Sequence, residues 1–198
     1  MFKNNKVLIR FTGLAGVILL WTTTLLAMLR TGLGLIDSRP LSHLGVDPLS
    51  SMLFSTGLVV SSVLFVLFAL FARRTYRANK RFLIYFFIGQ AGQIIVAVAP
   101  YGMDSSYRLI HTVAAFTLAF SLPFLIREFA HSQKVVRYQK LFRYLFLLEL
   151  VMFVVGMGIF TMTRGIAPIG EILPAVGFHI WIIVATFTSF PAKLHVQK

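Results

Sequence analysis

The sequence predicts an all-α integral membrane protein: a single domain, residues 1–198, built as a bundle of six transmembrane helices. Of its 198 residues, 58% are hydrophobic and only 13% are charged, whereas a soluble domain usually carries about 25% charged residues. The mean hydropathy is +0.83. A chain of this size has more apolar surface than one aqueous core can bury, so lipid must be part of its solvent.

The hydrophobic residues fall into runs of the length that a membrane span requires. A helix needs about 20 apolar residues to cross the hydrocarbon core, and charged residues, Pro or Gly separate the runs. The predicted helices cover residues 8–29, 51–72, 82–99, 106–126, 142–162 and 172–190. The first run follows basic residues, as in a signal peptide. However, it exceeds an h-region of about 7–15 residues and no A-x-A cleavage pattern follows it, so we interpret it as a retained helix.

The distribution of Lys and Arg predicts the orientation. Basic residues cluster before the first helix, in the second and fourth connections, and after the sixth helix. These clusters hold 15 of the 19 basic residues, and only Arg30, Arg39, Arg108 and Arg164 fall elsewhere. Cytoplasmic loops carry such an excess. The sequence therefore predicts a multi-pass protein of the cell (inner) membrane with the N and C termini in the cytoplasm.

The composition also limits the partners. The formal net charge is +13, but it comes from short clusters between apolar runs rather than from one basic face. This pattern indicates topology and attraction to anionic membrane lipids, and it argues against nucleic acid as a partner. The chain has no cysteine, which excludes disulfides, thiolate catalysis and cysteine-ligated metal.

The first outer connection, residues 30–50, is the longest. Connections of more than about 12–15 residues are usually functional or structured. This one carries Asp37, Arg39, His43 and Asp47 among apolar residues. It is predicted to lie on the membrane, to pack over the bundle as a cap, or to be a plain amphipathic connector.

Polar residues also lie inside the predicted helices. Asp104, Arg108 and His111 are spaced to share one helical face, and His111 would lie about 9 Å into the membrane. His179, on the last helix, would lie roughly 10 Å deep from the same side, and Gln93 falls near that level. Because unpaired polar groups are costly in hydrocarbon, these side chains are expected to converge on a cavity that opens outward.

Three functions remain open for this cluster. The first is an outward-facing polar pocket that binds a lipid headgroup or another amphiphile. The second is a metal-dependent membrane hydrolase or transferase, in which zinc activates water and His43, Asp104, His111 and His179 are the candidate ligands. No tight motif such as H-E-x-x-H supports it. The third is a structural subunit of a membrane complex. The candidate binding residues are His43, Asp47, Gln93, Asp104, Arg108, His111 and His179.

Two further features concern the helix interiors. Glu149 lies close to the middle of the fifth helix, where an ionised carboxyl is expensive, so it is expected to be protonated or paired. Small residues at Gly13/Gly16, Gly89/Gly92 and Gly156/Gly158 predict close contacts between helices.

Two segments resemble a known family. Residues 40–62, PLSHLGVDPLSSMLFSTGLVVSS, and residues 88–120, IGQAGQIIVAVAPYGMDSSYRLIHTVAAFTLAF, resemble the bacterial membrane family called domain-of-unknown-function 998. The layout is also similar to that of the DRAM-type and Sfk-type six-helix proteins, which are linked to lipid handling. The resemblance implies six helices, and it implies that certain polar positions match those of the family: His43, Asp47, Pro100, Asp104 and His111.

The seven-helix ceramidase-like membrane hydrolases are a more distant comparison. They place His and Asp ligands in a similar outer cavity. This chain has one predicted helix fewer and lacks their paired-histidine helix motif.

Overall fold

The computed structural model describes residues 3–101 and 105–188, and their regular secondary structure is entirely helical. Six of the helices are long and apolar enough to cross a membrane. The elements in chain order are α1 (Lys3–Thr31), η1 (Leu41–Gly45), α2 (Ser51–Tyr76), α3 (Lys80–Val98), α4 (Ser105–His131), α5 (Val136–Met162) and α6 (Pro168–Thr188). The six-helix prediction is confirmed.

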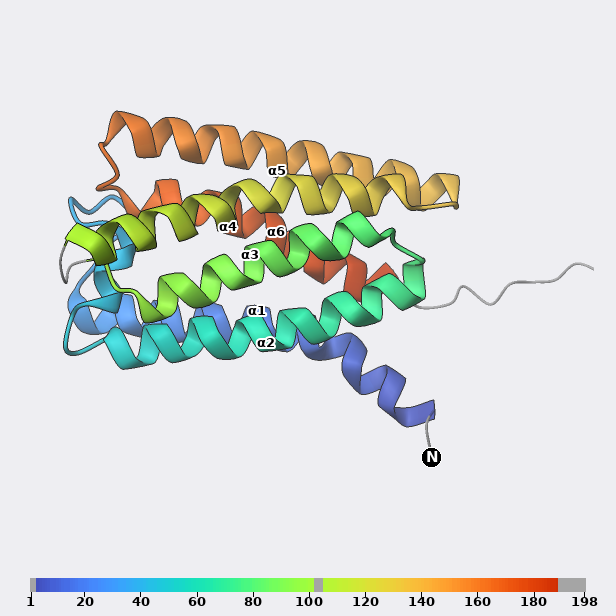
Figure 1. The fold of residues 1–198 in the computed structure, drawn as a ribbon, viewed down its shortest axis with the longest axis horizontal. Coiled ribbons are helices and arrows are strands. Elements are labelled where there is room, and N and C mark those ends of the chain that lie inside the picture. The colour runs from blue at the N-terminus through green and yellow to red at the C-terminus, as the bar shows by residue number, and fades with distance from the viewer. Residues whose placement is uncertain (1–2, 102–104, 189–198) are drawn as a thin grey trace, which may run out of the picture.

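Figure 1 shows the helices running alongside one another as three hairpins. The hairpins α1–α2, α3–α4 and α5–α6 all close at the same end of the bundle, which we call the cap end because η1 lies there. The short links α2–α3 and α4–α5, residues 77–79 and 132–135, lie at the opposite end, which we call the basic end. Most of the described Lys and Arg residues lie at the basic end.

Several predicted boundaries were too narrow. α2 continues to Tyr76 and α4 to His131, whereas α5 begins at Val136 and α6 at Pro168. The predictions followed hydropathy, which detects only the part of a helix inside the hydrocarbon core. Charged residues with long aliphatic stems let a helix continue through the headgroup region. The predicted residues 189 and 190 of the last helix lie outside the described residues.

Local signals set the ends of the helices. Asn79 caps α3, where its side-chain oxygen accepts a hydrogen bond from the Phe82 N–H at 2.8 Å. α1 ends at Thr31, and the φ of +65° at the following Gly32 allows the Leu33 N–H to bond the Met28 carbonyl at 3.0 Å. Pro168 opens α6, at a position where its missing N–H costs nothing.

The core of the bundle is aromatic and centres on α6. Trp181 is fully buried and its ring contacts the rings of Phe68, Phe82, Phe129 and Phe178. These rings come from α2, α3 and α4 as well as from α6 itself. In contrast, only 17% of the most apolar stretch of α5 is buried, which makes α5 the most peripheral of the six helices.

Glycines bring neighbouring helices close together. A Cβ added to Gly92 on α3 would lie 2.8 Å from the Ala114 carbonyl oxygen on α4, and one on Gly156 of α5 would lie 2.8 Å from the Gly170 carbonyl oxygen on α6. The predicted contact at Gly158 is wrong, because nothing lies within 4 Å of a Cβ added there. The two glycines are only two residues apart, so they face different sides of the helix.

The long first connection packs onto the bundle. Leu44 of η1 is fully buried, and its carbonyl accepts a hydrogen bond from the Ser50 hydroxyl at 2.9 Å. η1 contacts α1, α2 and α6, and the Ile169 N–H bonds the Leu35 carbonyl at 3.2 Å. Of the predicted arrangements of this segment, the structure favours the cap.

Candidate functional site

A cavity of about 290 Å³ lies among the helices near the cap end. Every one of the six helices contributes to its wall, and residues 40–42, just before and within η1, cover part of it. Most of the wall is apolar. Each helix contributes apolar residues to the wall. One example from each of α1 to α6, in order, is Leu20, Leu58, Val96, Phe116, Met157 and Phe178. A concave, mostly apolar site with a few polar groups is the usual form of a small-molecule site.

His179 of α6 is one of the predicted site residues that line this cavity, and its side chain is buried, at 4% exposed. The Trp21 indole N–H of α1 donates a hydrogen bond to His179 Nδ1 at 3.1 Å. An indole nitrogen only donates, so Nδ1 must be the acceptor, and a neutral ring then carries its proton on Nε2. No hydrogen bond from the described residues reaches Nε2. His179 therefore has one N–H donor free for a ligand.

Gln93 of α3 lines the cavity and is 4% exposed. Its amide nitrogen donates to the Leu58 carbonyl at 3.0 Å and to the Ser61 hydroxyl at 2.9 Å, both on α2. An amide nitrogen has two hydrogens, so both are used, and Gln93 joins α3 to α2. Its side-chain oxygen is an acceptor with no partner among the described residues.

His111 of α4 lines the cavity from the side of the α3–α4 hairpin. Its Nδ1 lies 2.8 Å from the Ala99 carbonyl oxygen, and since a carbonyl only accepts, Nδ1 carries the hydrogen. Its ring meets the Tyr101 ring edge to face, with centroids 5.6 Å apart. His111 thus satisfies a carbonyl left free by the end of α3.

Four of the seven predicted binding residues are not part of the described wall. His43 lies in η1, and Asp47 forms a turn by accepting a hydrogen bond from the Leu49 N–H at 2.8 Å. Arg108 is exposed and lies over the Tyr101 ring, 5.5 Å from its centroid. Asp104 lies outside the described residues.

Sequence reasoning missed several polar residues of the wall, among them Trp21, Glu171 and Arg164. The Glu171 carboxylate, in the first turn of α6, faces the backbone N–H groups of Leu41 and Ser42. The available signal was an acidic residue at the start of a predicted helix. Trp21 gave no such signal, because an aromatic residue in an apolar run is most often packing.

Among the described residues, the one ion pair lies in the cap segment, where Arg39 Nη2 is 2.9 Å from Asp37 Oδ2. The Arg39 guanidinium holds the pKa of the Asp37 carboxyl well below its usual range. The pair also bonds locally, with the Arg39 N–H donating to Asp37 Oδ1 at 3.0 Å. This arrangement stiffens the cap and places neither residue in the cavity wall.

The described residues do not assemble the predicted zinc ligands. Within 3–101 and 105–188, no group of three or more His, Asp or Glu side chains is arranged to hold a metal ion. His111 and His179 each use Nδ1 in a hydrogen bond to the protein, and His43 does not line the cavity.

Glu149 lies on α5 away from the cavity wall. It is fully buried, and one of its carboxyl oxygens lies directly against Gly177 of α6. Neither oxygen has a hydrogen-bond partner among the described residues. Glu149 was predicted to be either protonated or paired. The described residues supply no partner for its carboxyl group.

No family model, curated protein or solved structure matches the chain. The resemblance to the domain-of-unknown-function 998 family therefore stays a prediction.

Proposed function

We propose that this integral membrane protein binds an amphiphile, such as a lipid, in the cavity near its cap end. The observation that carries the proposal is the composition of the cavity wall. All six helices supply apolar surface, and Gln93, His111 and His179 bring polar groups from three different helices to the same space.

The hydrogen bonds within the wall support a ligand with a polar head. The Nε2–H of His179 is a donor, and the Gln93 side-chain oxygen is an acceptor. Hydrogen bonds to other residues already hold both side chains in place, so ordering them on ligand binding costs little conformational entropy. A hydroxyl or amide group could bond to both atoms, while its hydrocarbon chain would contact the apolar wall.

The distribution of charge supports an orientation with this cavity facing away from the cytoplasm. The basic residues of the α2–α3 and α4–α5 connections lie at the opposite end, and cytoplasmic loops carry the excess of Lys and Arg. In this orientation the amphiphile would enter from the outer leaflet of the cell membrane.

Loss of a polar wall residue is expected to weaken retention of the amphiphile. In His179→Leu the ligand loses its donor and the Trp21 N–H loses its acceptor, so native mass spectrometry of the purified protein should show at least fivefold less bound lipid. His43→Leu is the matched control, since His43 lies in η1 but does not line the cavity. Equal lipid in His179→Leu and the wild type would contradict the proposal.

Reporter fusions test the orientation separately. Fusions at residues 78 and 134 fall in the two links at the basic end, and both are expected to report a cytoplasmic location. An external signal from either fusion would overturn the proposed orientation without bearing on whether the cavity binds a ligand.

A further inference from the structure

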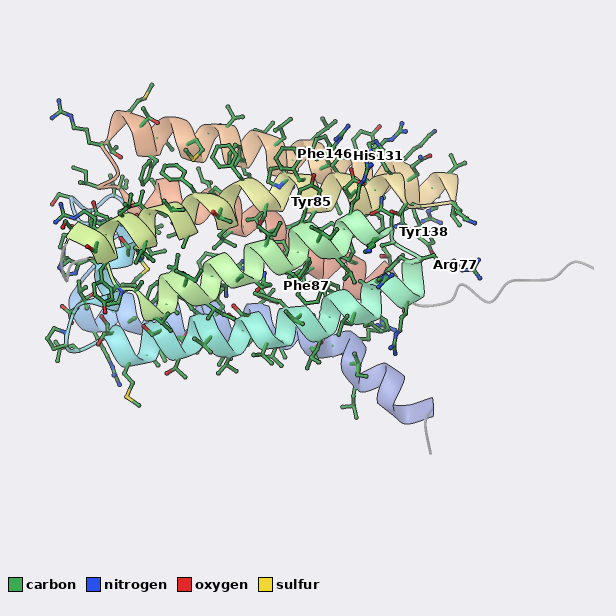
Figure 2. All side chains as sticks on the ribbon, in the orientation of Figure 1. Arg77, Tyr85, Phe87, His131, Tyr138 and Phe146 are labelled. Carbon is green, nitrogen blue, oxygen red and sulfur yellow. The ribbon has the colours of Figure 1, made fainter. Side chains whose placement is uncertain are left out.

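A second concave site lies between α4 and α5 at the basic end, far from the cavity described above. It is a groove of about 220 Å³ lined by Arg127, Ala130, His131, Arg143, Phe146 and Leu147. We call it the α4–α5 groove. In Figure 2, the labelled His131 and Phe146 lie near each other where α4 and α5 run side by side.

Helical spacing explains why these residues meet. Arg127, Ala130 and His131 lie at positions i, i+3 and i+4 of α4, so they share one face of that helix. Arg143, Phe146 and Leu147 have the same spacing on α5. Two antiparallel helices thus each turn one arginine and one or two apolar residues toward the same groove.

The two arginines are exposed, and neither forms an ion pair with a described carboxylate. Glu128, which follows Arg127 in the sequence, accepts a hydrogen bond from the Asn79 side chain at 2.8 Å and forms no ion pair with Arg127. Both arginines of the groove therefore have no ion-pair partner among the described residues.

Below the arginines the groove becomes apolar. Leu147 is 52% exposed, and farther along α5 Val151 and Val154 are 59% and 58% exposed. An arginine pair above an apolar helix face matches a molecule with an anionic head and a hydrocarbon tail.

The depth of the arginines fits this ligand. Arg143 follows the first residue of α5 by seven positions, which is about 10 Å along the helix. A 27-residue helix is about 40 Å long, close to the full thickness of a bilayer with its headgroups. Arg143 therefore lies near the boundary between headgroups and hydrocarbon, where lipid phosphates are found.

We propose that the α4–α5 groove binds an anionic phospholipid, with its phosphate between Arg127 and Arg143 and an acyl chain along Leu147 and the exposed face of α5. Guanidinium groups suit this role because they bond phosphate oxygens in a bidentate manner. The site is independent of the cavity near the cap end.

Native mass spectrometry with added phosphatidylglycerol or phosphatidylcholine tests the proposal. The wild type is expected to retain one phosphatidylglycerol more tightly than phosphatidylcholine, and Arg127→Gln/Arg143→Gln should weaken that retention at least tenfold. Arg73→Gln/Arg74→Gln is the matched control, because it removes the same charge from exposed residues at the end of α2. Ala119→Phe, in the other cavity, should leave the phosphatidylglycerol bound.

Three results would overturn the proposal. They are an equal loss in the control pair, equal retention of phosphatidylcholine, and displacement of phosphatidylglycerol by inorganic phosphate alone, which would indicate a free-anion site. Melting temperatures show whether each variant folds. Arg127→Lys/Arg143→Lys keeps the charge without the bidentate geometry and should restore only part of the binding.

Discussion

Gly156→Ala is expected to destabilise the protein, whereas Gly158→Ala on the same helix is expected to leave it unchanged or slightly more stable. The Cβ added at Gly156 would meet the Gly170 carbonyl oxygen at 2.8 Å and Pro174 Cδ at 2.9 Å. The carbonyl belongs to the backbone of α6, so it can move only if α5 and α6 separate. Overpacking of this kind costs about 1–3 kcal/mol.

Gly158 is the matched control because nothing lies within 4 Å of the Cβ added there. Both substitutions gain the better helix propensity of alanine, worth about 1 kcal/mol, so their difference isolates the contact between helices. Thermal unfolding in one detergent measures it. A melting temperature for Gly156→Ala equal to that of Gly158→Ala would mean that α5 and α6 do not approach each other here.

Ala119→Phe is expected to reduce lipid retention in the cavity at least tenfold. Ala119 lines the cavity, and a phenyl ring there would occupy space that the ligand needs. Because the ring fills an existing void with apolar surface, the variant should fold and melt no lower than the wild type.

Val113→Phe is the control for this substitution. Val113 lies on the same helix but is 56% exposed and does not line the cavity. Native mass spectrometry should show both lipids in Val113→Phe, whereas Ala119→Phe should lose the lipid of the cavity and keep the phospholipid of the α4–α5 groove. Equal loss in both variants would attribute the effect to α4 in general and not to the cavity.

The six helices were predictable because hydropathy alone decides which segments lie in hydrocarbon. Counting 1.5 Å per residue from the helix ends also put Gln93, His111 and His179 at one level, and the structure places all three in one cavity wall. The rise of a helix is constant, so depth can be read from a sequence when the helices run roughly parallel to the membrane normal.

Other residues of the site could not be predicted in this way. Arg108 shares the predicted face of His111, yet it lies one turn nearer the helix end, where it covers the Tyr101 ring. The role of Trp21 depends on α1 lying beside α6, a contact between the first and last helices that no local pattern encodes. The position of His43 depends on how the cap segment folds back, which loop composition does not determine.

The most direct test of ligand binding in the cavity is photo-crosslinking with a lipid that carries a photoactivatable acyl chain, followed by peptide mapping. Binding in the cavity predicts labels on wall residues such as Phe116 and Met157, and loss of those labels in Ala119→Phe. Labels confined to exposed residues such as Val113 and Val154, with no change in Ala119→Phe, would contradict it.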